Sequence, residues 1–425
     1  MRPEAEDLSG FPEASAGCPQ CGAEVELGVG DPVLRCAFCR TGLYVRPRDF
    51  LGYHWPWEGA APPGLVWVPY WRFRGLWYRL FASGARGSLL DGTGPGRAGL
   101  REGSHLGVRP QAVRFRLGPP VKGRVVWPDR AVAQVVDEAE TQAEAAGGEA
   151  APLRRFVGEV TAVLWVPFAL ERRGGGWALL PLFPDGPGGA LAGGEALALR
   201  RALDEPPRPW APRFLPLRCP ECAADLPAVP HAVGFWCGRC GRGWVPGRRR
   251  LEPLAFRVRV SHGSGVRYLP VWELEIGARG LSFRSQADMV RWAVPYWTPN
   301  PGDDRTPPLV RIPAFKLHPR LFLRAARNLT LGSVAGGDAT RLPAGPAEAE
   351  AVRLPLSEAA QALKPVLAEL AGSQRGKAAS VLSARLRVRA ARLVLLPFAR
   401  RGAEWVEETS GVAVPAAALE RGRGL

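Results

Sequence analysis

Four short segments of this chain alternate arginine with apolar residues. They are Trp71–Arg74, Val113–Leu117, Phe256–Val260 and Arg385–Arg389. A period of two places successive side chains on opposite faces of a strand, so the pattern predicts half-buried strands whose apolar side faces inward. All the arginines should then lie on outer faces, and they would form a basic stripe if the strands shared a sheet. The predicted stripe consists of Arg72, Arg74, Arg114, Arg116, Arg257, Arg259, Arg385, Arg387 and Arg389.

Each half of the chain also has an alanine-rich segment followed by an apolar run. In the first half, residues 129–150 (DRAVAQVVDEAETQAEAAGGEA) favour a helix and residues 163–177 favour a strand. In the second half, residues 356–372 (LSEAAQALKPVLAELAG) and 393–405 repeat this order. Both apolar runs contain a Pro-Phe pair. The acidic residues of the first helix could also pair with part of the basic stripe.

Five apolar segments combine proline with aromatic residues. They lie at 68–71, 166–168, 269–272, 294–297 and 396–398. Proline is scarce in central strands, so these segments should be strand starts, edges or bulges. We expect their aromatic rings to pack in the core of a β domain, and the alternative is that they form a binding surface.

The eight cysteines of the chain all belong to Cys-x-x-Cys pairs. Fourteen residues separate the two pairs of each set, which is just below the usual range for zinc sites of this type. Four thiolates suit a tetrahedral Zn²⁺ and leave no open coordination position, so both sites should be structural rather than catalytic. The less favoured alternatives are metal-free thiols, disulfides or iron. The predicted ligands are Cys18, Cys21, Cys36 and Cys39 in the first site, and Cys219, Cys222, Cys237 and Cys240 in the second.

Residues 18–45 and 219–246 resemble the zinc ribbon (rubredoxin-like knuckle) family, with the CPxCG motif at the first knuckle. The resemblance implies a β-hairpin fold around one structural zinc ion in each ribbon, hence two ions in all. It implies no particular activity. The second ribbon departs from the pattern at Ala223, where glycine usually follows the knuckle. His231 lies between the second pair of knuckles and is surplus to a complete ligand set.

The two cysteine sets are part of a longer repeat. Each cysteine of the second set lies 201 positions after its counterpart, and the same offset relates Gly42 to Gly243 and Pro69 to Pro270. A gap-free register over about sixty residues indicates an internal duplication. The Pro-Phe pairs are 230 positions apart, so the second half should carry an insertion, which we place near residues 299–308.

These patterns predict a mainly β fold with some α, in which each zinc ribbon precedes a β-rich domain. The predicted segments are an acidic, flexible N-terminus (1–17), ribbon 1 (18–48), a β-rich domain with a helix (49–203), a proline-rich linker (204–216), ribbon 2 (217–250) and a second β-rich domain with a helix (251–425).

The charge of the chain favours anionic partners. The formal net charge is +16, and residues 373–401 contain eight basic and no acidic residues. Such a surface suits a nucleic acid or an acidic protein. The acidic N-terminus lacks an apolar core segment, and no apolar run reaches the length of a membrane span, so we expect a cytoplasmic protein without membrane contact.

The sequence shows no convincing constellation of catalytic residues. It lacks a phosphate-binding GxxxxGK[ST] loop, HExxH and GxSxG, and its five histidines are scattered. No small-molecule substrate is evident. The favoured hypothesis is a non-catalytic, nucleic-acid-associated protein whose strand arginines bind phosphates. The alternatives are a zinc-stabilised scaffold for protein partners and an enzyme of unrecognised class.

Overall fold

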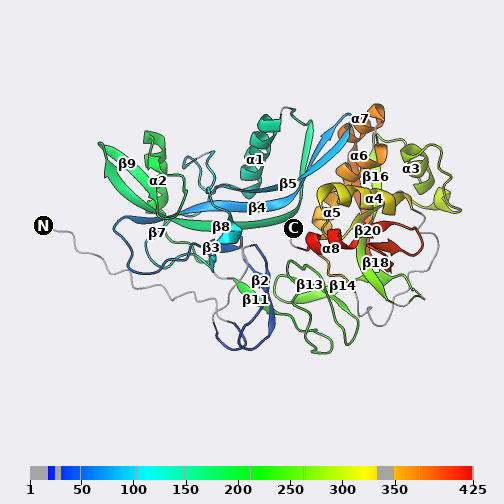
Figure 1. Cartoon of the computed structure of the whole chain (residues 1–425), viewed down its shortest axis with the longest axis horizontal. Coiled ribbons are helices and arrows are strands. Elements are labelled where there is room, and N and C mark those ends of the chain that lie inside the picture. Colours follow the sequence, from blue (N-terminus) through cyan, green and yellow to red (C-terminus); the bar gives the residue numbers. More distant parts are fainter. Residues whose placement is uncertain are drawn as a thin grey trace. The chain divides into compact units, whose positions relative to one another are not determined.

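Figure 1 shows the computed structural model of the chain. The structure describes residues 18–23, 30–47, 49–101, 103–147, 149–210, 212–261, 263, 265–332, 349–372 and 374–423. The predicted acidic N-terminus lies outside these residues. Within the described part, no helix has the length and apolarity needed to cross a membrane.

The first half is dominated by long strands. The aromatic and β-branched run VWVPYWRF lies inside a 17-residue strand, and the predicted alanine- and glutamate-rich helix forms as α1. Its elements are β1 (Val33–Arg35), β2 (Gly42–Arg46), β3 (Gly52–His54), β4 (Leu65–Phe81), β5 (Gly84–Pro95), the 3-10 turn η1 (Pro110–Ala112), β6 (Arg116–Leu117), β7 (Arg124–Val125), α1 (Val132–Gly147), β8 (Leu153–Arg173), β9 (Gly176–Pro181), β10 (Gly189–Ala190) and α2 (Gly193–Asp204).

The second half contains more helix than the first. The predicted helix at 356–372 forms as two short helices, α5 and α6. Its elements are β11 (Arg213–Pro216), β12 (Phe235–Trp236), β13 (Gly243–Pro246), β14 (Leu251–Leu254), β15 (Phe256–Val258), β16 (Val266–Arg279), α3 (Gln286–Ala293), η2 (Asp303–Arg305), β17 (Leu309–Pro313), α4 (Pro319–Leu331), α5 (Leu356–Gln361), α6 (Leu363–Ala371), α7 (Arg375–Ser383), β18 (Arg385–Arg401), β19 (Glu404–Glu407), β20 (Ala413–Pro415) and α8 (Ala416–Gly422).

The main sheets of the two halves use the same strand pairings. In the first half, β3 lies parallel to β8, with Tyr53 opposite Leu164, and β8 also pairs with β4 and β9. In the second half, β15 lies parallel to β18, with Arg257 opposite Val394, and β18 also pairs with β16 and β19. Leu164 and Val394 are 230 positions apart, as the two Pro-Phe pairs are. The fold is therefore mainly β, with a repeated layout that is consistent with duplication.

The prolines of the repeated segments occupy equivalent places in this layout. Pro167 and Pro397 lie inside β8 and β18, each one residue before the ladder to the following strand begins. Pro270 lies inside β16, one residue before its ladder to β17 begins. A proline nitrogen cannot donate to a ladder, so a position at the end of one is where a long strand tolerates it.

The chain divides by its internal contacts into two compact units. Unit 1 comprises Met1–Arg72, Thr93–Glu138 and Thr161–Phe214, and unit 2 comprises Phe73–Gly92, Ala139–Val160 and Leu215–Leu425. The division cuts β4, β5, α1 and β8, so each of these elements contributes to both units. The segment boundaries predicted from the sequence stay a prediction, because these units are defined by contacts.

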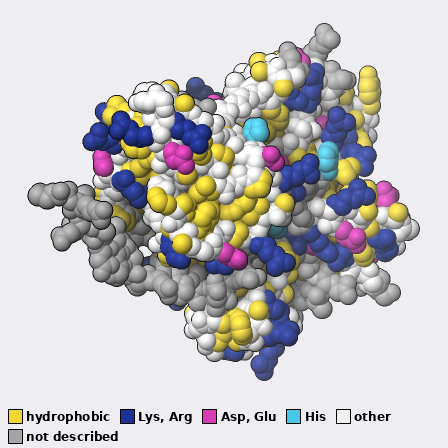
Figure 2. Space-filling view, turned by 60° about the vertical axis from the view of Figure 1, so that its left-hand side comes forward, with side chains coloured by type: hydrophobic (Ala, Val, Ile, Leu, Met, Phe, Trp, Pro, Cys, Tyr) yellow, Lys and Arg dark blue, Asp and Glu magenta, His cyan; other side chains and the backbone are white. Residues whose placement is uncertain are grey.

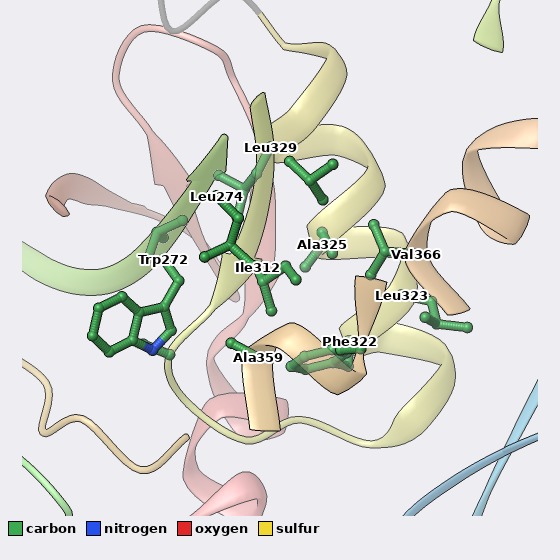
Figure 3. Close-up of a cluster of buried hydrophobic side chains, with 14 of the residues drawn as sticks. Trp272, Leu274, Ile312, Phe322, Leu323, Ala325, Leu329, Ala359 and Val366 are labelled. Carbon is green, nitrogen blue, oxygen red and sulfur yellow. The ribbon is translucent and has the colours of Figure 1, made fainter. Parts of the chain in front are cut away.

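Unit 2 has a core between sheet and helices. Figure 3 shows Trp272 and Leu274 of β16 and Ile312 of β17 beside Phe322 and other side chains of α4. Ala359 of α5 and Val366 of α6 belong to the same cluster of buried residues. Each such apolar side chain contributes about 1.5–3 kcal/mol on burial, so this cluster is the main source of stability in the unit.

One buried carboxylate in unit 2 is enclosed by arginines. Glu273 of β16 is 6 % exposed, and its two carboxylate oxygens accept hydrogen bonds from Nε of Arg311 at 2.7 Å and Nε of Arg392 at 2.5 Å. Burial disfavours ionisation of Glu273, but the charges and hydrogen bonds of the two arginines outweigh it and hold its pKa below the ordinary value. The interactions of Glu273 with Arg311 and Arg392 therefore depend on the ionised form of its carboxylate.

Candidate metal centres

The eight cysteines form two separate clusters of four. In each cluster the sulfur atoms all lie within 4.8 Å of one another. Sγ of Cys18 is 3.6 Å from that of Cys39, and Sγ of Cys21 is 3.7 Å from that of Cys36. The matching distances in the second cluster are 3.4 Å (Cys219 to Cys240) and 3.5 Å (Cys222 to Cys237).

These sulfur spacings fit a metal centre and not a disulfide. Bonded sulfurs are about 2.05 Å apart. Four sulfurs around a tetrahedral Zn²⁺, with bonds of about 2.3 Å, are about 3.8 Å apart. Both clusters can therefore hold one metal ion each, with a complete set of four thiolates and no open position. The two clusters are consistent with zinc ribbons.

The backbone at all four Cys-x-x-Cys turns is the same. In the first turn, the amide of Cys18 donates to the carbonyl of Ala23 at 2.8 Å, and the amide of Gly22 donates to the carbonyl of Cys18 at 2.8 Å. The turns that begin at Cys36, Cys219 and Cys237 repeat both bonds. The residue after the second cysteine has a positive φ in every turn, at 75° for Gly22, 63° for Arg40, 58° for Ala223 and 68° for Gly241.

This conformation predicts opposite effects for two substitutions. Gly22→Ala should destabilise ribbon 1 by about 1 kcal/mol, because a residue with Cβ is strained at positive φ. Ala223→Gly removes the same strain from ribbon 2 and should stabilise it by a similar amount. The resistance of each ribbon to a chelator, followed by amide hydrogen exchange, measures both effects. Equal behaviour of Gly22→Ala and the parent protein would contradict the prediction.

The first cysteine of each turn is buried and the second is more accessible. Cys18, Cys36, Cys219 and Cys237 are at most 2 % exposed, and Cys21 is exposed. Hydrogen bonds to the hydroxyl and amide of Thr41 lower the pKa of the Cys39 thiol to about 6. In the second cluster, burial of Cys237 is outweighed by the amides of Cys240 and Arg239, and its pKa falls to about 7. Each cluster thus contains a thiol that ionises readily, as a metal ligand must.

Ribbon 1 is part of the core of unit 1. Leu43 and Val45 of β2 are fully buried in the same cluster as Tyr53 of β3, together with the ligands Cys18 and Cys36. The amide of Gly30 donates to the hydroxyl of Tyr53 at 3.3 Å. The metal centre is therefore attached to the β-rich domain through both packing and a hydrogen bond.

Ribbon 2 is attached to unit 2 through the residue beside a ligand. Trp236 precedes Cys237, is 8 % exposed, and packs edge-on against Phe256 with ring centroids 4.8 Å apart. Its Nε1 donates to the carbonyl of Glu350 at 3.2 Å. The amide of Val233 also donates to the carbonyl of Val352 at 2.7 Å. The segment at 349–354 is thus the docking partner of this ribbon, which sequence patterns did not reveal.

The predicted arginine stripe is only partly correct. Arg114, Arg116, Arg257, Arg385, Arg387 and Arg389 are exposed, as expected. The expectation of an outward arginine is wrong for two residues, Arg72 at 4 % and Arg259 at 8 % exposure. β4 is covered on both faces around Arg72, and Arg259 lies within the electrostatic reach of Glu407 and Glu273. Arg74 is half-buried, with Nε 3.6 Å from a carboxylate oxygen of Asp91.

The arginines also do not share one sheet. Those of β4 and β6 belong to the eight-stranded sheet, and those of β15 and β18 belong to the six-stranded sheet. Of the strand predicted at 113–117, only Arg116 and Leu117 form a strand, β6. The residues before them follow the 3-10 turn η1 and lie outside any strand. The acidic helix α1 forms ion pairs with Arg130 through Glu138 and with Arg154 through Glu140 and Glu144.

The proline-aromatic segments are mostly core, as expected. Tyr70 and Phe168 are fully buried, and Trp272 and Phe398 are buried in unit 2. The segment at 294–297 differs, because Tyr296 is 99 % exposed and Trp297 is 51 % exposed. The exposed rings of Tyr296 and Trp297 are the one part of the five segments with the character of a binding surface. His231, the histidine between the second pair of knuckles, is half-buried and lies outside the four-sulfur cluster.

The metal clusters are thus the best-defined chemistry of the described chain. They bring together all eight cysteines that the sequence predicts as ligands. No protein-family model matches this chain, and neither a curated protein nor a solved structure shows significant similarity to it.

Proposed function

We propose that this chain is a non-catalytic, nucleic-acid-associated protein in which two Zn²⁺ ions stabilise the fold. Zinc is the favoured metal because four thiolates in a closed tetrahedral set are typical of structural zinc sites. With all four positions filled by protein sulfur, such an ion has no position for a substrate. The ions would therefore hold the ribbons to their domains and leave partner binding to other surfaces.

The observation that supports nucleic-acid association is a set of exposed arginines without acidic partners. None of the six exposed stripe residues forms an ion pair with any residue that the structure describes. They are Arg114, Arg116, Arg257, Arg385, Arg387 and Arg389. Figure 2 shows that Lys and Arg outnumber Asp and Glu on the face in view. Arginines that find no carboxylate within the protein are available to phosphates.

Salt titration of binding tests this function. The full-length protein should bind a random-sequence, fluorescently labelled oligonucleotide at 50 mM salt, as measured by anisotropy. Since each neutralised phosphate releases a counterion, the logarithm of the affinity should fall linearly with the logarithm of the salt concentration. An affinity no better than millimolar at low salt, for DNA and RNA alike, would contradict the proposal.

The exposed aromatic pair supports a second candidate, a scaffold for protein partners. Large apolar side chains that face solvent are common in protein interfaces. Association of this kind would survive high salt and would be lost in a Tyr296→Ser/Trp297→Ser variant. What co-purifies with the full chain, before and after nuclease and high salt, separates the two candidates.

A further inference from the structure

Two exposed arginines face each other across neighbouring strands of unit 2. Arg279 ends β16 and Arg385 begins β18, and the antiparallel register places them directly opposite. Side chains opposite each other in such a pair lie on the same face, with Cβ atoms about 4.5–5.5 Å apart. Like charges in this position destabilise a sheet. An anion bound between the two guanidinium groups would relieve this repulsion.

The same face continues along β18 as a row of arginines. Leu386 and Val388 are half-buried and pack against the core of unit 2, so the residues between them face solvent. Arg385, Arg387 and Arg389 are all exposed. Residues two apart on a strand are about 6.8 Å apart. This is close to the separation of neighbouring phosphates along one strand of a nucleic acid.

A glycine on the neighbouring strand makes room for the last arginine of the row. A Cβ on Gly277 of β16 would lie 2.8 Å from Nε and 3.2 Å from Nη2 of Arg389. The guanidinium of Arg389 therefore lies across β16, over a residue that is paired with Arg387. The register shifts between Glu275 and Ile276, next to this point. Arg389 is the residue of β18 that this shift leaves without a partner on β16.

The four arginines have no carboxylate partner among the described residues. None of Arg279, Arg385, Arg387 and Arg389 forms an ion pair with them. The nearest acidic residue along β16 is Glu275, which is opposite Ala390 and is not bonded to the row. Residues 373–401 contribute no acidic side chain at all. These four arginines therefore form a concentrated positive charge that no carboxylate among the described residues neutralises.

We propose that Arg279, Arg385, Arg387 and Arg389, the strand-end arginines, bind consecutive phosphates of one nucleic-acid strand. Arg279 and Arg385 together hold one phosphate, which relieves their mutual repulsion, and Arg387 and Arg389 hold the next two. Contacts to the phosphates carry no base information, so binding is independent of sequence. This inference rests on the proposed function and narrows it to one site.

A pair of double variants on the same strand tests the site. Arg385→Gln/Arg387→Gln removes two charges from the row. Arg400→Gln/Arg401→Gln removes two exposed charges from the far end of β18 and is the matched control. Binding of a labelled 20-nucleotide DNA single strand to the full chain is measured between 50 and 200 mM salt. The first variant should weaken binding roughly five- to tenfold, and its salt slope should become shallower by about 1.4.

The control variant should change affinity by about twofold at most, because its two arginines lie at the opposite end of β18 from the row. Equal weakening by both variants would overturn the site but leave nucleic-acid association standing. Failure of the parent protein to bind any oligonucleotide would overturn the proposed function itself. Gly277→Ala is a further variant, which displaces the guanidinium of Arg389 without changing the charge, and it should also weaken binding.

Three probes identify what the row recognises. A peptide nucleic acid of the same base sequence lacks phosphates and should not bind. A DNA duplex should bind through the same arginines, because either of its strands presents the phosphate spacing. Inorganic polyphosphate should compete with the oligonucleotide only weakly. Equal binding of the peptide nucleic acid, or competition by polyphosphate at equal phosphate concentration, would contradict recognition of a nucleic-acid strand.

Discussion

Replacing Cys237 by serine is expected to unfold ribbon 2 and to loosen the adjacent core of unit 2. The substitution removes one of four metal ligands, and structural zinc contributes on the order of 10 kcal/mol to the folding of small finger domains. The loss of this ligand should also loosen the contacts of the neighbouring Trp236, which packs against Phe256 and donates to the carbonyl of Glu350. Hydrogen exchange of amides at 233–237 and 349–354 should rise together, and the metal content should fall from two ions to one.

Two further variants make this result specific. Cys36→Ser is the equivalent change in ribbon 1 and should instead expose the amides of β2, which pack in the core of unit 1. Arg239→Ser changes an exposed residue of the same knuckle as Cys237 and should keep both the metal and the exchange pattern. If Cys237→Ser retained two metal ions and full protection, a structural role for the second cluster would be wrong.

Replacing Glu273 by glutamine is expected to destabilise unit 2 by about 3–5 kcal/mol. The change leaves Arg311, which is 9 % exposed, without its carboxylate partner in a buried environment. Chemical denaturation of the full chain, followed by hydrogen exchange of β16, measures the loss. Glu275→Gln is the matched control on the same strand, because Glu275 is half-exposed, and it should stay within about 0.5 kcal/mol of the parent.

The same carboxylate should make stability depend on pH. The pKa of Glu273 is lower in the folded chain than its ordinary value of 4.5, and that of Glu350, beside Arg353 and Arg423, is lowered too. The ionised groups therefore contribute stability above about pH 4.5, and this contribution is lost as the pH falls through the folded pKa values. Glu273→Gln should flatten the acid branch of the stability profile. An unchanged acid branch would contradict this assignment.

The proposed phosphate-binding site shares its strands with the core of unit 2 but is not part of that core. β16 and β18 carry both the buried carboxylate of Glu273, which accepts from the exposed Arg392, and, at one end of the pair of strands, the strand-end arginines. Loss of binding in a variant is therefore informative only where the strands stay folded. For this reason the arginine variants use exposed residues, whose replacement changes stability by about 0.5 kcal/mol or less.

Local sequence patterns were most informative where one short segment contains the whole signal. The Cys-x-x-Cys pairs identified all members of both clusters, because the spacing within each pair suffices to build the turn. The helix at 129–150 and the strands around the Pro-Phe pairs also formed near the predicted positions. The intrinsic helix and strand propensities of these segments agree with the structures that they adopt, so tertiary contacts did not override the local preference.

Patterns of period two were less reliable about which face is covered. Alternation at Phe256–Val260 predicted that Arg259 faces outward, yet it is buried near Glu407 and Glu273. The carboxylates that act on its charge come from β19 and β16, and neither lies within the short segment that shows the alternation. No local pattern contains that information, since a strand covered on both sides can bury a charge if another strand supplies its partner.

By itself, the sequence determined the two cysteine clusters, the mainly β character and the repeated order of elements. All of these follow from spacing within short segments or from a constant offset between two of them. Only the tertiary structure decided that β3 and β15 lie parallel to β8 and β18, that Trp236 docks ribbon 2, and that Arg279 stands opposite Arg385. The physical reason is that strand register and side-chain contact join residues far apart in the chain, where one sequence carries no periodic signal.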